Sequence, residues 1–166
     1  MSTETLEETM GTRPEHQHEW LRNLIGEWRT ESEMIMPDGS RQTAHGRETI
    51  ESLGGLWALG KGSVKIADAQ MDYITGLGWD VSFKEYRGFK IMSASSHLWK
   101  STGTLSEDDR TMTLDCVGPN MEIEGETANY RDVIRIVDAN HLTLTSSGQD
   151  AEGTWHEYMT AHYTRE

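Results

Sequence analysis

The two ends of the chain carry the feature that most constrains its fold. Near the start, the segment 24–28 (Leu-Ile-Gly-Glu-Trp) ends a helical pattern at a glycine and begins a strand with a tryptophan. At the other end, the last strand-like segment, 155–165, finishes at Arg165. Between them lie short alternating segments separated by turn residues. First and last strands of this kind can pair with each other, so the pattern predicts a closed antiparallel barrel, a fold that usually encloses a cavity.

One helix is predicted ahead of the first strand. Thr12 and Glu15 stand three residues apart, as in a capping box, and Pro14 is tolerated in a first helical turn. Trp20 and Leu24 then recur at the spacing of one helix face, and Gly26 ends the pattern.

From Glu27 the hydrophobic period changes to two. About ten strands are predicted, over residues 27–36, 41–53, 56–66, 73–79, 86–93, 97–105, 111–117, 128–137, 141–146 and 154–165. Ten strands joined in sequence by hairpins can close and leave no free edge, which favours an all-β up-and-down barrel over a sandwich. We expect a flexible tail over residues 1–11 and a single barrel domain over 12–166.

Charge and cysteine content narrow the function classes. The chain has 15 Lys and Arg against 28 Asp and Glu, a net charge of −13, which disfavours nucleic acid and anionic membrane as partners. Cys116 is the single cysteine, so no intramolecular disulfide is possible. It lies in a strand-like segment without a neighbouring base, which indicates a buried apolar residue rather than a nucleophile. No signal-like or membrane-spanning apolar stretch is present, and we expect a cytoplasmic protein.

Several short motifs follow one another along almost the whole chain: 19–21 (Glu-Trp-Leu), 24–28, 53–57 (Leu-Gly-Gly-Leu-Trp), 103–105 (Gly-Thr-Leu), 118–119 (Gly-Pro), 130–133 (Tyr-Arg-Asp-Val) and 155–159. In these motifs the chain resembles a bacterial family known as domain of unknown function 1579. That resemblance implies no assigned activity.

Gly26 and Trp28 also resemble the first-strand signature of the calycin superfamily of ligand-binding (lipocalin-like) barrels. In that superfamily a basic residue of the last strand packs over this tryptophan, and Arg165 is the matching residue. Such a contact is worth ~0.5–2 kcal/mol, so the resemblance implies a structural role for both residues. It concerns the architecture alone.

Aromatic and acidic residues of the strands are the candidates for ligand binding. In strand 128–137 the more apolar face carries Tyr130 and Asp132, which predicts that both face inward. Arg131 faces the other way unless a bulge switches the register. An inward Asp132 is explained more simply by a hydrogen bond to a neighbouring strand than by ligand binding. The full predicted ligand-binding set is Glu48, Trp57, Trp79, Trp99, Tyr130, Arg131 and Asp132.

The histidines show no metal-binding spacing, and neither a phosphate loop nor a nucleophile with its base is visible. The sequence therefore predicts no metal and no cofactor. Haem held by one interior histidine, His97 or His156, is a less favoured alternative.

These patterns predict a barrel that binds a small, partly apolar or amphipathic molecule in its interior without catalysis. One alternative is an enzyme on the same scaffold, with Asp132 or Glu48 as the base and Tyr130 or a histidine as the acid. Another is an interaction module with a solid barrel, an exposed apolar patch around Trp20 and a homodimeric state.

Overall fold

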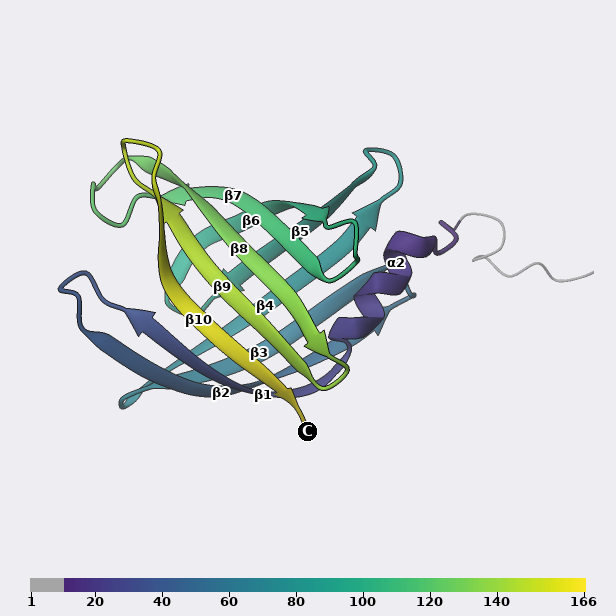
Figure 1. Ribbon diagram of the computed structural model, residues 1–166, viewed down its shortest axis with the longest axis horizontal. Helices are drawn as coiled ribbons and strands as arrows, with labels where there is room; N and C mark the ends of the chain where they lie inside the picture. Colours follow the sequence, from purple (N-terminus) through teal and green to yellow (C-terminus); the bar gives the residue numbers. More distant parts are fainter. Residues whose placement is uncertain (1–10) are drawn as a thin grey trace, which may run out of the picture.

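The computed structural model describes residues 11–166, and these residues form a closed ten-stranded antiparallel barrel (Figure 1). Each strand pairs with its neighbours in sequence, and β1 pairs with β10 to close the barrel. The strands are β1 (Gly26–Ile35), β2 (Arg41–Leu53), β3 (Trp57–Ile66), β4 (Ala69–Asp80), β5 (Glu85–Met92), β6 (Ser95–Leu105), β7 (Thr111–Pro119), β8 (Thr127–Asp138), β9 (His141–Gln149) and β10 (Trp155–Arg165). The predicted fold class is confirmed. The flexible tail predicted for residues 1–11 falls almost wholly outside the described residues.

The helix is shorter than the sequence predicts. It consists of α2 (His16–Trp20) and a 3-10 turn, η1 (Leu21–Leu24), and its N-cap is Glu15 rather than Thr12. Pro14 disfavours a helical conformation at the residue before it, which prevents a start at Thr12. The capping box is instead built by Glu15 and His18, whose Nδ1 accepts a hydrogen bond from the Glu15 amide at 2.8 Å. Within residues 11–166, no helix has the length and apolar character needed to cross a membrane.

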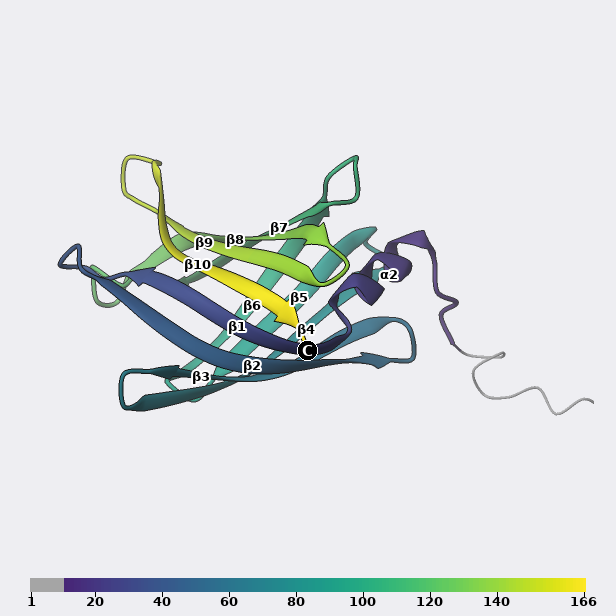
Figure 2. The same cartoon turned by 60° about the horizontal axis from the view of Figure 1, so that its bottom comes forward.

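The helix covers one end of the barrel, which we call the helix end (Figures 1 and 2). Trp28 is fully buried there, and its Nε1 donates a hydrogen bond to the Leu24 carbonyl at 2.8 Å. The Arg165 guanidinium lies 4.2 Å from the centre of the Trp28 ring, and its Nη1 donates to the Ile25 carbonyl. The expected contact between the last strand and the first is therefore present, and it joins the helix to the point of barrel closure.

The apolar core is concentrated toward this end. Its buried members are Trp20, Leu21, Leu24, Trp28, Ile50, Ala58, Leu77, Tyr86, Met112 and Leu142. Trp20 is 5% exposed, so the apolar surface patch predicted around it as the alternative to ligand binding is not there.

The rest of the barrel interior has a different character. Strand alternation turns Lys90, Trp99, Cys116 and Asp132 inward, in register with other inward-facing positions, yet all four are only half-buried. Since their side chains point away from the outer wall, their remaining exposure indicates that the interior toward the end opposite the helix, the far end, is not tightly filled. The fold thus combines a plugged helix end with a solvent-accessible interior.

Candidate ligand-binding site

The seven predicted ligand-binding residues divide between the two faces of the barrel wall. Glu48, Trp79, Trp99, Tyr130 and Asp132 face inward, whereas Trp57 and Arg131 lie on the outer wall. Trp57 is 37% exposed and covers Gly78 on the neighbouring strand. Arg131 donates from Nε to Asp115 at 2.7 Å and lies 4.3 Å over the ring of Trp155. The β7–β8 register runs without a shift past Arg131, so no bulge turns it inward.

Trp79 belongs to the plug at the helix end. Its ring lies 5.0 Å from that of Tyr86, edge to face, and its Nε1 donates to Glu15 Oε2 at 3.3 Å. The buried His18 accepts from the Glu15 amide at Nδ1, which leaves Nε2 to donate to the Trp79 carbonyl at 3.1 Å. These contacts tie Trp79 to the helix, at a distance from the solvent-accessible interior.

Toward the far end, four rings from three sections of the chain form what we call the aromatic row. Ring centres are 4.8 Å apart for His97 and Trp99, 5.2 Å for Trp99 and Tyr130, and 6.4 Å for Tyr130 and Tyr158. Each contact is edge to face, the geometry that aromatic quadrupoles favour. A bulge between Glu157 and Met159 breaks the alternation of β10 and brings Tyr158 into the row.

Two members of the aromatic row present unpaired polar atoms. In residues 11–166, the buried side-chain nitrogens and oxygens without a hydrogen-bond partner are His97 Nε2, Trp99 Nε1 and Thr30 Oγ1. All three belong to inward-facing side chains. An unsatisfied buried polar atom costs about 1–3 kcal/mol, so each favours a partner from outside the chain, either water or a ligand. By contrast, the Tyr130 hydroxyl is satisfied by the Pro119 carbonyl at 2.6 Å.

A second polar group surrounds Asp132 on the β8–β9 side of the interior. Ser146 donates to Asp132 Oδ1 at 2.5 Å, the cross-strand bond that the sequence favours over a ligand contact. Burial, with the charge of Asp132 added to it, raises the pKa of Tyr158. Burial also raises the pKa of Cys116 to about 11, with Asp132 and Asp115 contributing. Cys116 is therefore protonated at neutral pH, as expected of an unreactive thiol.

A third group, the Glu48 cluster, consists of Glu48, Tyr73, Thr75 and Tyr163 from strands β2, β4 and β10. Tyr73 donates to Glu48 Oε2 at 3.0 Å and Thr75 to Oε1 at 3.3 Å, and Tyr163 also bonds the carboxyl group. Burial raises the pKa of Glu48 above its ordinary 4.5, against the opposing effect of these hydrogen bonds. Burial likewise raises the pKa of Tyr73 and Tyr163. The carboxyl group is thus held in a nearly dry, hydrogen-bonded setting.

Glycines on β3 make room for the Glu48 cluster. A Cβ on Gly60 would lie 2.3 Å from Glu48 Oε1, and one on Gly62 would lie 2.2 Å from the Tyr73 ring. The bare backbone of β3 therefore lets both side chains lie flat against the inner wall. The aromatic row contains the same arrangement. Trp99 packs over Gly118, and a Cβ on Gly118 would lie 2.1 Å from the Trp99 ring.

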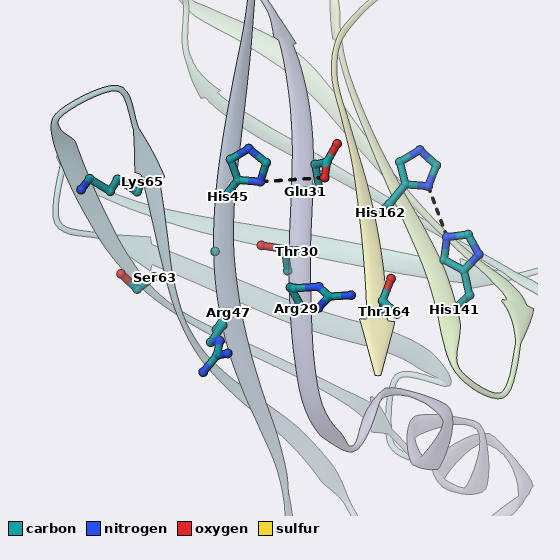
Figure 3. A pocket seen from close by; sticks show the side chains of 11 residues that line it. Arg29, Thr30, Glu31, His45, Arg47, Ser63, Lys65, His141, His162 and Thr164 are labelled. Atoms are coloured by element: carbon teal, nitrogen blue, oxygen red, sulfur yellow. Dashed lines mark hydrogen bonds and ion pairs between the residues drawn. The ribbon is translucent and has the colours of Figure 1, made fainter. Parts of the chain in front are cut away.

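A separate pocket of about 760 Å³ lies on the outer wall across β3, β2, β1, β10 and β9 (Figure 3). The basic side chains around it include Arg29, Arg47, His45 and the stacked pair His141 and His162, whose Nε2 and Nδ1 are 3.2 Å apart. Its side chains are open to water: those of Arg47 and His45 are 77% and 69% exposed. A small molecule there would stay mostly hydrated, whereas ligand sites bury most of the ligand surface, so the interior is the stronger candidate.

Metal binding finds no support among residues 11–166, where no three His, Cys, Asp or Glu side chains gather closely enough to hold an ion. His156, considered above as a haem ligand, pairs with Asp150 at 2.6 Å on the exposed surface.

Comparison with known proteins places the chain in a family. It belongs to the family described as protein of unknown function (DUF1579), whose model matches residues 13–165. No curated protein is significantly similar to it in sequence.

Solved structures share its fold, and two of them illustrate the likeness. One is the S-type phycobiliprotein lyase CPES from Guillardia theta, with a TM-score of 0.60 and 10% identity over 92% of this chain and 98% of that one. The other is Rv2717c from M. tuberculosis, with a TM-score of 0.62 and 10% identity over 93% of this chain and 99% of that one. At such low identity these likenesses establish the barrel architecture and nothing about activity.

Proposed function

We propose that the protein binds a small, partly apolar molecule in the far half of the barrel interior, against the aromatic row. The observation that carries this proposal is the pairing of apolar ring surface with unsatisfied polar atoms, His97 Nε2 and Trp99 Nε1. Predominantly aromatic walls with a few placed polar groups are the usual composition of a small-molecule site. Within the predicted set, Trp99 and Tyr130 form the apolar wall, and Asp132 lies beside them.

The plugged helix end supports the same proposal. Trp28, Trp79 and the helix fill that end, so a ligand has one route in, from the far end. The glycines beneath Trp99 and Tyr73 let these rings lie close against the wall. A site of this kind takes up a ligand without a large rearrangement of the strands.

Acid–base catalysis is the second candidate, favoured by the 3.0 Å contact between Tyr73 and Glu48. Two titratable groups within hydrogen-bond reach are what such chemistry requires. We rank it second because Glu48 and Tyr73 are only 4% and 6% exposed and their polar atoms bind one another. A substrate would first have to displace these contacts.

The proposal is tested by titration with N-phenyl-1-naphthylamine, a neutral aromatic probe that becomes fluorescent in apolar surroundings. We expect saturable binding to the intact protein. Trp99→Ala should weaken it by about 10-fold, because the substitution removes the central ring of the aromatic row.

Trp57→Ala is the matched control, since it removes a tryptophan from the outer wall and should leave the affinity unchanged. Equal affinities of the two variants would contradict binding at the aromatic row. Absence of saturable binding to the intact protein would count against the interior as a site for such molecules.

A further inference from the structure

Lys90 places a positive charge inside the barrel. It faces inward on β5, opposite Thr75 on β4 and Trp99 on β6, and its Nζ lies 5.1 Å from the centre of the Tyr73 ring. Burial raises the pKa of both Glu48 and Cys116, and the charge of Lys90 opposes both shifts. Because Glu48 and Cys116 belong to β2 and β7, on opposite sides of the barrel, the ammonium group lies in the interior between them.

This charge has no counter-ion in the described part of the chain. None of the ion pairs within 4.0 Å in residues 11–166 includes Lys90. The other lysines and arginines of the strands lie on the outer face, apart from Arg165 over Trp28. A cation inside the barrel that makes no ion pair favours an anionic ligand, which would supply the missing partner.

Two interior carboxyl groups already accept hydrogen bonds from other side chains. Asp132 accepts a hydrogen bond from Ser146, and Glu48 accepts from Tyr73 and Thr75.

A second donor stands beside this cation. Trp99, whose Nε1 has no partner, is the direct cross-strand neighbour of Lys90 on the same inward face. Directly opposed side chains of an antiparallel pair have their Cβ atoms about 5 Å apart, and the four-carbon stem of a lysine spans that separation. An oxyacid group has at least two oxygens and can accept from both donors at once.

We propose that the ligand of the interior is an organic anion, an apolar body bearing one carboxylate or sulfonate group that is bound by Lys90 and Trp99. This inference rests on the proposed function and specifies the class of ligand. The apolar body lies along Trp99 and Tyr130, and the anionic group neutralises the interior charge.

Two fluorescent probes of matched shape test the inference: 1-anilinonaphthalene-8-sulfonate and its uncharged analogue N-phenyl-1-naphthylamine. Both are titrated into the full chain at 0.15 M salt, where the Debye length of about 8 Å screens the net negative charge of the protein. We expect the sulfonate to bind at least 10-fold more tightly. Lys90→Met should abolish that preference. Trp99→Phe, which keeps a ring but removes Nε1, should reduce the affinity for the sulfonate several-fold more than the affinity for the neutral probe.

Lys100→Met is the matched control, because Lys100 lies beside Trp99 in sequence but on the outer face of β6. It should retain the full preference, and thermal unfolding of each variant verifies that the barrel is intact. Equal affinity of the intact protein for both probes, or a preference that survives in Lys90→Met, would overturn the inference and leave interior binding in place. Failure of both probes to bind would overturn the inference and the proposed function together.

Discussion

Replacing Trp28 with alanine is expected to lower the free energy of unfolding by about 4 kcal/mol, as for other fully buried tryptophans. Trp28 is 0% exposed, and three kinds of contact depend on it. Its ring packs in the apolar plug, its Nε1 donates to the Leu24 carbonyl, and the Arg165 guanidinium lies over its face. The loss is measured by urea denaturation followed by circular dichroism.

The control for this prediction is Trp57→Ala, which removes the same side chain from the outer wall. Because Trp57 is more than one-third exposed, its loss should cost about 1 kcal/mol or less. Trp28→Phe keeps a ring beneath Arg165, so its loss of free energy of unfolding should lie between those of Trp28→Ala and Trp57→Ala. A cost below about 1 kcal/mol for Trp28→Ala would show that the closure of the barrel does not depend on this residue.

The second large effect concerns pH and Glu48. Burial raises the pKa of Glu48 in the folded state above its ordinary 4.5, so the folded protein holds this proton more tightly than the unfolded chain does. The stability that comes from the protonated group is complete below pH 4.5 and is lost as the pH rises through the folded-state pKa. As the pH rises from 4.5 through the folded-state pKa, the free energy of unfolding of the intact protein should therefore fall relative to that of Glu48→Gln. The expected fall is about 1.4 kcal/mol for each pH unit that separates the pKa of Glu48 in the folded state from its pKa in the unfolded state.

Urea unfolding at half-unit steps from pH 4.5 to 8 gives this difference directly. Subtracting the Glu48→Gln curve removes the contributions of the histidines, which are common to both proteins. Glu51→Gln, on the same strand but exposed, is the control and should run parallel to the intact protein. Parallel curves for Glu48→Gln would mean that burial does not hold the proton on Glu48.

Much of the fold was predictable because the residues at which the barrel closes can be recognised in the sequence. Gly26, Trp28 and Arg165 lie at the seam where the first and last strands pair, and period-two alternation located the strands between them. The start of the helix was mispredicted because Thr12 and Glu15 match the sequence pattern of a capping box. A helix that starts at Thr12 would need a helical conformation at the residue before Pro14, which the proline disfavours. The side chain that completes the actual box, His18, is not a residue type that the pattern includes.

The candidate site was less accessible to sequence reasoning. Alternation within β8 correctly separated Tyr130 and Asp132 from Arg131, because that strand has a clear apolar face. Trp57 follows a two-glycine turn, after which the sequence does not show which alternate side chains of the next strand face inward. Its side chain lies on the outer wall.

Other members of the site depend on information that alternation does not contain. Tyr158 enters the aromatic row through a bulge. The Glu48 cluster joins β2, β4 and β10, whose relative register depends on the closure of the whole barrel. Lys90 could have been found from the sequence, since it is a lone cation on the inward-facing positions of its strand.

The most direct test of interior ligand binding is native mass spectrometry of the freshly purified protein, compared with its mass after denaturation. We expect an additional small-molecule mass on the native protein that is lost on denaturation and is diminished in Trp99→Ala. Bare protein that also fails to bind the naphthylamine and naphthalenesulfonate probes, fatty acids, flavins and haem would contradict it.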